Sequence, residues 1–214
     1  VIVTYLPFCM IREAFQFLFK LTLSRNQMLR DITMMRSEIA DLKKELVPFT
    51  DEEMEILSLR QTNTSKKRGF QKILKGIFST IFYEPLIAYA IKTYSADQRL
   101  ILISTSDLEF IYLDKDNKTH VYINDFEVGV LTKNGHLLNA KNQLLARIDG
   151  GDELPTHTVY INEKDYGYIV NPRFVNKTSP RAYSLFRNMN RDERNLFLCL
   201  TLVNLVEEAY LPKQ

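Results

Sequence analysis

The side chains with the greatest chemical potential in this chain are its three histidines and its two cysteines. His120, His136 and His157 lie far apart, and none stands in HExxH or another close spacing that zinc ligands require. Cys9 and Cys199 each lie in an apolar run and form no CxxC pair. Cys199 has no basic neighbour that would activate its thiol. These residues therefore predict neither a metal site nor a catalytic nucleophile.

Two groups of closely spaced acids could in principle bind calcium. Asp114 and Asp116 in LDKDNKTH match the beginning of an EF-hand loop, but Thr119 replaces the required glycine and no glutamate closes the loop. A solvated hairpin turn fits this segment better, and the acids of 149–153 are a weaker calcium candidate. GxSxG, Walker and GxGxxG motifs are absent from the sequence. We therefore predict no catalytic residue, no cofactor, no metal ion and no enzymatic activity.

Composition indicates a folded protein with balanced charge. The 214 residues are 45% hydrophobic and 25% charged, which is ordinary for one or two globular domains. The net charge of +2 gives no reason to expect nucleic acid as a partner.

The N-terminal residues favour attachment to a membrane or a partner. The chain begins at Val1 rather than at a methionine, and we therefore expect either a processed chain or a segment of a longer protein. Residues 1–11 are apolar but too few to span a bilayer, and the longer stretch 1–23 contains three charges. Three interpretations stay open: the end of a transmembrane helix, an interfacial amphipathic helix, and an apolar helix packed on a partner. A signal peptide fits poorly, because no basic region precedes the apolar run.

A heptad pattern follows, and it predicts one long helix over about residues 8–46, ended by Pro48. This helix is interpreted as a coiled-coil stalk, with an amphipathic helix lying on its own domain as the alternative. The apolar seam for a partner helix is formed by Leu18, Leu21, Met28, Ile32, Met35, Ile39, Leu42 and Leu46.

Short helices are expected next. Thr50 and Glu53 have the spacing of a capping box, which predicts a helix to about Arg60. After a polar loop over 61–69, large apolar residues recur at helical spacing over 69–94. The basic and aromatic residues of this segment predict contact with an anionic membrane, although an ordinary helix against the barrel, with its lysines extending to solvent, explains them slightly better. The predicted contact residues are Lys66, Lys67, Arg68, Phe70, Lys72, Lys75, Phe78 and Phe82.

From residue 98 the pattern changes to short β-rich runs separated by turn sequences. Asn134-Gly135 predicts a tight hairpin turn with positive φ at both central positions. VYINDFEVGVL (121–131) matches VYINEKDYGYI (159–169), so we predict a duplicated hairpin. Gly129 and Gly167 occupy the same place in the two copies, which a bulge or a close backbone approach would explain.

The last predicted element is a helix over 195–211 that is apolar on nearly every side. Between Leu196 and Val206 only Thr201 and Asn204 are polar. Such a helix must be buried, yet its apolar run is too short to cross a bilayer. We therefore expect it inside the β domain.

This β-rich region with its repeated hairpins and apolar closing helix resembles the Tubby C-terminal, LURP-one and phospholipid-scramblase superfamily over about residues 98–211. The resemblance implies a closed barrel around the C-terminal helix, although the region is shorter than the usual barrel of that family. The segments FTDEEMEILSLRQ and FYEPLIAYAIKTY resemble a family of uncharacterised, membrane-associated, Bacteroidetes-like bacterial proteins, which implies no activity.

The predicted fold class is α+β, with a long N-terminal helix, short helices, and an antiparallel sheet or barrel around a hydrophobic C-terminal helix. The predicted domains are a coiled-coil helix (1–48), a helical connector (49–97) and the barrel (98–214). The predicted function is that of a non-catalytic, membrane-associated scaffold or binding subunit that meets a protein partner, or itself, through its N-terminal helix. The alternative is a lipid-handling protein of scramblase-like type. Basic residues after the first apolar run favour a cytoplasmic globular part.

Overall fold

The computed structural model describes residues 24–63, 73–95, 97–115, 117–151, 153–175 and 180–210. It separates the chain into two units, residues 1–34 and 35–214, and each unit is considered by itself. In the first unit the described part is the beginning of helix α2 (Arg25–Lys44). Ser24 caps this helix, because its hydroxyl oxygen accepts a hydrogen bond from the backbone N–H of Gln27 across 3.2 Å.

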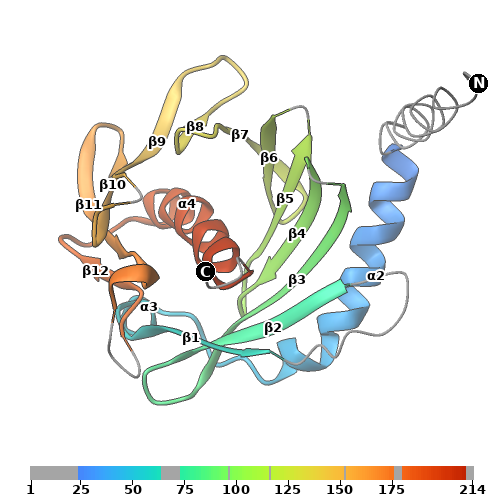
Figure 1. Ribbon diagram of the computed structural model, residues 1–214, viewed down its shortest axis with the longest axis horizontal. Helices are drawn as coiled ribbons and strands as arrows, with labels where there is room; N and C mark the ends of the chain where they lie inside the picture. The colour runs from blue at the N-terminus through green and yellow to red at the C-terminus, as the bar shows by residue number, and fades with distance from the viewer. Residues whose placement is uncertain are drawn as a thin grey trace, which may run out of the picture. The chain divides into compact units, whose positions relative to one another are not determined.

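The second unit contains twelve strands in one antiparallel sheet, and each strand pairs with the next one in sequence. The strands are β1 (Leu57–Asn63), β2 (Ile73–Thr80), β3 (Pro85–Ser95), β4 (Gln98–Ser104), β5 (Glu109–Lys115), β6 (Lys118–Ile123), β7 (Phe126–Leu131), β8 (His136–Leu138), β9 (Leu144–Asp149), β10 (Thr156–Ile161), β11 (Lys164–Val170) and β12 (Tyr183–Leu185). The smaller elements are α3 (Asp51–Glu55) and the 3₁₀ turn η1 (Pro172–Phe174). Figure 1 shows the strands following one another around α4 (Arg191–Tyr210).

The sheet curves until its two ends meet. A single β-bridge joins Ser58 of β1 to Arg181, just before β12. Two backbone hydrogen bonds flank this bridge: the N–H of Ala182 donates to the carbonyl of Leu57 across 2.7 Å, and the N–H of Leu59 donates to the carbonyl of Pro180 across 3.0 Å. The sheet is therefore a nearly closed barrel, and the barrel predicted from the sequence is confirmed.

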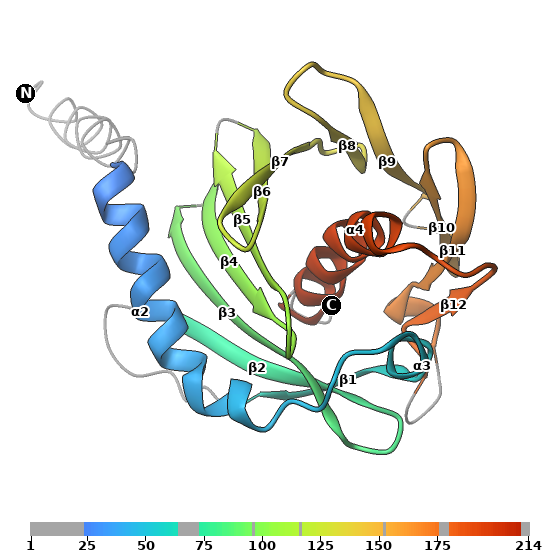
Figure 2. The same cartoon turned by 180° about the vertical axis from the view of Figure 1, so that it is seen from behind.

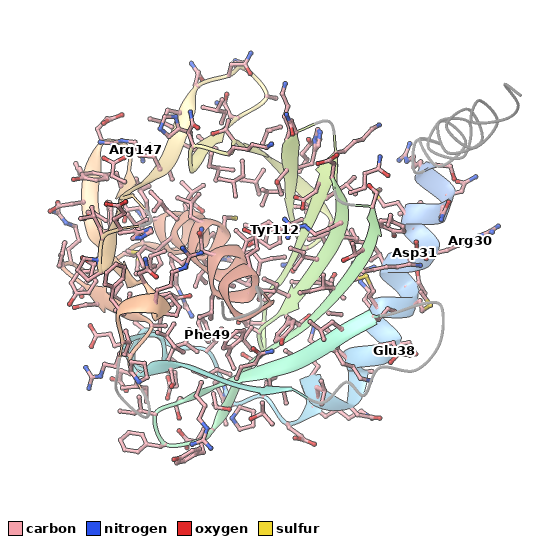
Figure 3. The ribbon with its side chains drawn as sticks, viewed as in Figure 1. Arg30, Asp31, Glu38, Phe49, Tyr112 and Arg147 are labelled. Carbon is pink, nitrogen blue, oxygen red and sulfur yellow. The ribbon has the colours of Figure 1, made fainter. Side chains whose placement is uncertain are left out.

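Helix α4 fills the barrel. Its side chains Phe197, Leu198 and Leu200 are fully buried in one core cluster with the inward side chains of the strands. Burying each of these side chains contributes roughly 2 kcal/mol of hydrophobic free energy. Figure 3 shows Tyr112 of β5 at the boundary between the strands and α4. At the other end of α4, the N–H of Glu193 donates to Asn190 Oδ1 across 3.0 Å, so the predicted asparagine cap is confirmed.

The outer face of β2 to β5 is also apolar and buried. Its side chains include Ala88, Leu100 and Leu102, which alternate with the inward residues and lie outside the core cluster around α4. Residues 35–44, the last part of α2, lie outside this part of the wall (Figures 1 and 2). Met35 and Ile39 of this part are buried. The wall is therefore apolar on both faces at β3 and β4.

Two ionic contacts fasten residues 35–44 to the wall. Arg36 Nε donates to Glu109 Oε1 of β5 across 2.9 Å, and the guanidinium also contacts Asp125 in the β6–β7 turn. Lys75 Nζ of β2 donates to the carbonyl oxygen of Glu38 across 2.8 Å and to its carboxylate across 2.9 Å.

The predicted hairpin duplication is confirmed. β6 with β7, and β10 with β11, are antiparallel pairs that share the same irregularity in register next to the paired glycine. The turns Asn124-Asp125 and Asn162-Glu163 have positive φ at both central residues, as a two-residue type I′ turn requires. At 134–135 only the glycine has positive φ, so that turn differs from the one expected.

The two repeat glycines are required by close packing as well as by the bulge. A Cβ on Gly129 would overlap the carbonyl oxygen of Leu138, and one on Gly167 would overlap the carbonyl oxygen of Ser184. Both explanations offered for these glycines from sequence therefore apply.

The predicted fold class is wrong, because the chain is mainly a β barrel. The long helix predicted over 8–46 is not present as such: α2 covers Arg25–Lys44, and residues 8–23 lie outside the described residues. Its apolar side chains at Met35 and Ile39 are buried within the second unit, which explains the narrow seam without a coiled coil.

The helical connector predicted over 49–97 is also wrong. Helix α3 ends at Glu55 rather than near Arg60, and β1, β2 and β3 occupy most of the remainder. Strands buried on both faces have nearly continuous apolar runs, and periodicity alone does not distinguish these from a buried helix. Pro85, expected to break a helix, is the first residue of β3.

Candidate functional site

A polar pocket opens at the barrel end where α4 finishes, and we call it the end pocket. Its volume is about 360 Å³, at the lower end of the range for sites that bind small molecules. Three strand connections form its mouth, β3–β4, β5–β6 and β7–β8. Its described lining residues are Asp97, Arg99, Asp114, Lys115, Asn117, Lys118, Thr119, Leu131, Thr132, Lys133, Gly135, Asn204 and Glu207.

Arg99 is the centre of the pocket floor. It lies two residues before Ile101, and since side chains alternate along a strand it projects inward as Ile101 does. Its Nε donates to Asp114 Oδ2 across 2.6 Å, and its terminal nitrogen binds the carboxylate of Glu207 on α4. Thr119 completes the group, because its hydroxyl donates to Asp114 Oδ1 across 2.7 Å. The floor thus joins three strands to the helix.

The two carboxylates keep Arg99 charged despite its burial. Burial by itself lowers the pKa of this guanidinium, but the charges of Glu207 and Asp114 and their hydrogen bonds outweigh that effect. The pKa of Arg99 therefore lies above its usual value. Arg99 is a fixed cation, and the two carboxylates that bind it exceed its charge by one.

The rim of the pocket carries different chemistry. Lys115 and Lys118 flank the β5–β6 turn, and Lys133 lies in the β7–β8 turn. Within the part of the chain that the structure describes, no carboxylate forms an ion pair with any of these lysines. Asp97 is the described acid on the rim. The rim therefore presents three cationic groups that no carboxylate of the described residues pairs with.

A second, smaller pocket lies deeper between α4 and strands β10 to β12, and we call it the inner pocket. Its volume is about 30 Å³, enough for one water-sized molecule. His157 Nε2 and Tyr183 Oη are buried and lack a hydrogen-bond partner among the described residues. Burial raises the pKa of the Tyr183 phenol above its ordinary value. Asn204 lines both pockets, so the two are neighbours.

Of the residues predicted to contact a membrane, the described ones are Lys75, Phe78 and Phe82, and none of these three lines either pocket. Lys66, Lys67, Arg68, Phe70 and Lys72 lie outside the described residues. Lys75 binds Glu38, as described above.

The two aromatic members of that set behave in opposite ways. Phe78 is 0% exposed in the barrel core, which corrects its assignment as a lipid-contacting residue. Phe82, in the β2–β3 turn, is 68% exposed and stays available for a contact.

The predicted partner seam is likewise divided. Leu18 and Leu21 lie outside the described residues, and Met28 and Ile32 belong to the first unit. In the second unit Met35 and Ile39 are buried, while Leu42 and Leu46 are half-buried. Side chains that are buried within the second unit cannot also form a seam with another helix. The assignment of Met35 and Ile39 to the partner seam is therefore corrected.

The described residues among those considered for chemistry form no metal site. Among the described residues no three His, Cys, Asp or Glu side chains are placed to hold a metal ion. Asp114 binds Arg99 and Thr119 instead of standing free for calcium. Cys199 is buried, and burial raises the pKa of its thiol well above the usual range.

Sequence reasoning missed Arg99 and Glu207, which are 108 residues apart. One local pattern could have found the helical side of the site. Thr201, Asn204 and Glu207 recur every three residues on an otherwise apolar helix, so they form one polar stripe. That stripe faces the inner pocket and then the end pocket.

Comparisons with known protein families, with curated proteins and with solved structures find nothing that matches this chain. Within the described ranges, none of the helices has the length and apolar character needed to cross a membrane.

Proposed function

We propose that this chain is a non-catalytic binding module whose barrel offers the end pocket to a small ligand. The observation that carries the proposal is that the polar groups of the pocket floor and the lysines of its rim differ in whether they have partners. The polar groups of the floor bind one another, whereas the lysines of the rim line the pocket and have no ionic partner among the residues that the structure describes. A rigid floor below free recognition groups is typical of binding sites.

The same floor argues against catalysis. A nucleophile needs a base that can take its proton, and the Thr119 hydroxyl already donates to Asp114, which also binds Arg99. No histidine is among the described lining residues. Cys199 is in the core, away from the pocket lining.

We further propose that the barrel belongs with the Tubby C-terminal, LURP-one and scramblase-like group. What supports this is the meander of twelve antiparallel strands around a C-terminal helix, the arrangement that the resemblance implies. It would extend the resemblance back from residue 98 to β1. Attachment to a membrane stays a prediction that rests on residues 1–23 and on the basic, aromatic segment 66–82. A cytoplasmic barrel stays a prediction from the basic residues after the first apolar run, Lys20, Arg25, Arg30 and Arg36.

The lipid-handling alternative is less well supported. An acyl chain needs an apolar cavity of several hundred Å³, whereas the end pocket, of about 360 Å³, is lined mainly by polar and charged residues and the inner pocket holds about 30 Å³. The side chains on both sides of α4 are fully buried against the strands.

The proposal is tested with a panel of anionic, cationic, zwitterionic and neutral small molecules, by their effect on the melting temperature of the full chain. Leu131→Trp fills the end pocket, and Leu154→Trp adds the same bulk at an exposed loop position as a matched control. We expect one charge class to stabilise the wild type and Leu154→Trp but not Leu131→Trp.

If Leu131→Trp does not fold, Lys118→Trp on the exposed rim replaces it. The proposal would be rejected if no compound in the panel raised the melting temperature, or if a compound raised it equally when the end pocket was filled.

A further inference from the structure

We propose that the ligand of the end pocket carries a phosphate or carboxylate group on a small, uncharged, hydroxyl-bearing body. This inference rests on the proposed function and names the chemical class of its ligand. It follows from the position of charge within the pocket.

The rim determines the sign of the ligand's charge. Lys115, Lys118 and Lys133 come from two neighbouring connections, and none is paired with a described carboxylate. Lysine ammonium groups on long flexible stems adapt to phosphate and carboxylate oxygens as point charges. Three such groups around one opening favour an anion, and Asp97 offsets only one of them.

The charge of the floor determines which part of the ligand can lie deeper in the pocket. Arg99 carries one positive charge and is bound by two carboxylates, Asp114 and Glu207. The floor group therefore has a formal charge of −1, which would repel an anionic group brought into direct contact with it. An anion placed at the rim and a neutral body placed at the floor satisfy both charges.

The remaining lining residues suit a neutral, polar body. The Thr119 hydroxyl donates to Asp114 and its oxygen can still accept a hydrogen bond. Asn204 Nδ2 donates to the carbonyl of Leu200, which leaves its amide oxygen and second N–H for a ligand, and Leu131 offers one apolar contact. Such groups hydrogen-bond hydroxyls without requiring a charge. A volume of about 360 Å³ accommodates the anionic group together with a small body.

Glycerol phosphate has the proposed features and serves as the probe. Calorimetric titration of the full chain with glycerol phosphate is compared with inorganic phosphate, which lacks the body, and with glycerol, which lacks the anion. We expect glycerol phosphate to bind more tightly than either part, and its affinity to fall as salt is added.

A matched pair of variants locates the binding. Lys118→Gln with Lys133→Gln removes two rim cations, and Lys141→Gln with Lys164→Gln removes two cations that do not line the pocket. We expect Kd to rise at least about tenfold in the first double variant and to stay unchanged in the second. Equal weakening in both, or no weakening in either, would overturn the inference.

Vesicles distinguish a lipid headgroup from a free metabolite as the source of this chemistry. If phosphatidylglycerol vesicles, but not phosphatidylcholine vesicles, bind through the same two lysines, the anion belongs to a lipid. If only free glycerol phosphate binds, it belongs to a soluble ligand, and both results support the inference.

The two proposals fail in different ways. Binding of a cationic or neutral compound that Leu131→Trp abolishes, without binding of glycerol phosphate, overturns the ligand class and leaves the proposed function standing. Absence of any ligand sensitive to Leu131→Trp overturns both.

Discussion

The phenol of Tyr112 donates a hydrogen bond to the backbone carbonyl of Cys199 across 3.0 Å, inside the barrel. Tyr112 belongs to β5 and Cys199 to α4, so the bond fixes the helix along its axis relative to the wall. Both residues are buried. Apolar packing alone would allow the helix to shift, whereas a directional bond favours one position.

The first prediction concerns this bond at high pH. Burial raises the pKa of Tyr112 well above its ordinary value, so the folded protein keeps the proton after the unfolded chain has lost it. Above about pH 10 the unfolded state then binds fewer protons, and stability falls as pH rises, by about 1.4 kcal/mol per pH unit for each such tyrosine. Urea unfolding between pH 9 and 11 should give a shallower decline for Tyr112→Phe.

At pH 7 the same variant should lose about 1 kcal/mol, the contribution of one hydrogen bond. Tyr89 and Tyr183 also have raised pKa values through burial, so part of the alkaline decline should persist in Tyr112→Phe. Identical slopes for wild type and variant would contradict the assignment.

The second prediction concerns the repeat glycines. Gly129→Ala and Gly167→Ala should each destabilise the protein by about 1–3 kcal/mol, because the added carbon meets a backbone carbonyl that cannot move without its strand. Gly151→Ala is the matched control, since open space surrounds its position, and it should change stability by less than about 0.5 kcal/mol. Chemical denaturation measures all three, and a tolerated Gly129→Ala would reject the close approach.

The third prediction separates a barrel-bound helix from a coiled-coil seam. Met35→Ala removes a fully buried side chain and should lower the unfolding free energy by about 2–3 kcal/mol. Exposed Ser37→Ala should have little effect. Light scattering should give the same oligomeric state for wild type and both variants. A variant that dissociates an oligomer but keeps its stability would restore the coiled-coil interpretation.

The fourth prediction concerns the pocket floor. Arg99→Met leaves two carboxylates near each other without their cation and should cost about 1–3 kcal/mol. Adding Asp114→Asn and Glu207→Gln removes the stranded charges, so the triple variant should recover part of that loss. Urea unfolding at pH 7 is the measurement, and a triple variant less stable than Arg99→Met would show that the floor does not act as one charge group.

Local patterns predicted the parts of the fold that depend on local chemistry. The duplicated hairpins were readable because a type I′ turn needs residues such as Asn124 and Asn162 that tolerate positive φ. The helix cap at Asn190 could be predicted because it too depends on residues close in sequence, Asn190 and Glu193. Strands β2 and β3 could not be predicted in this way. Their outer-face residues, such as Ala88, are buried as well as their inward-facing ones, so the alternation of a half-buried strand is lost.

Local sequence patterns could not predict the candidate site. Arg99, Asp114 and Glu207 meet only when the barrel has formed around α4, and no local motif links a strand residue to one 108 positions later. The sequence from Lys115 to Lys118 indicates only an ordinary polar turn, because charged turn residues are common whether or not they border a pocket.

The position of α4 has a consequence for biosynthesis. Every strand that the structure describes precedes α4 in the chain, so this wall leaves the ribosome before the helix that occupies its centre. Neighbouring strands can pair as they emerge, at roughly 5–20 residues per second, but their inward apolar faces have no partner until α4 arrives. During that interval of several seconds the nascent chain exposes the surface most prone to aggregation. Chaperone demand should therefore peak just before translation of α4 is finished.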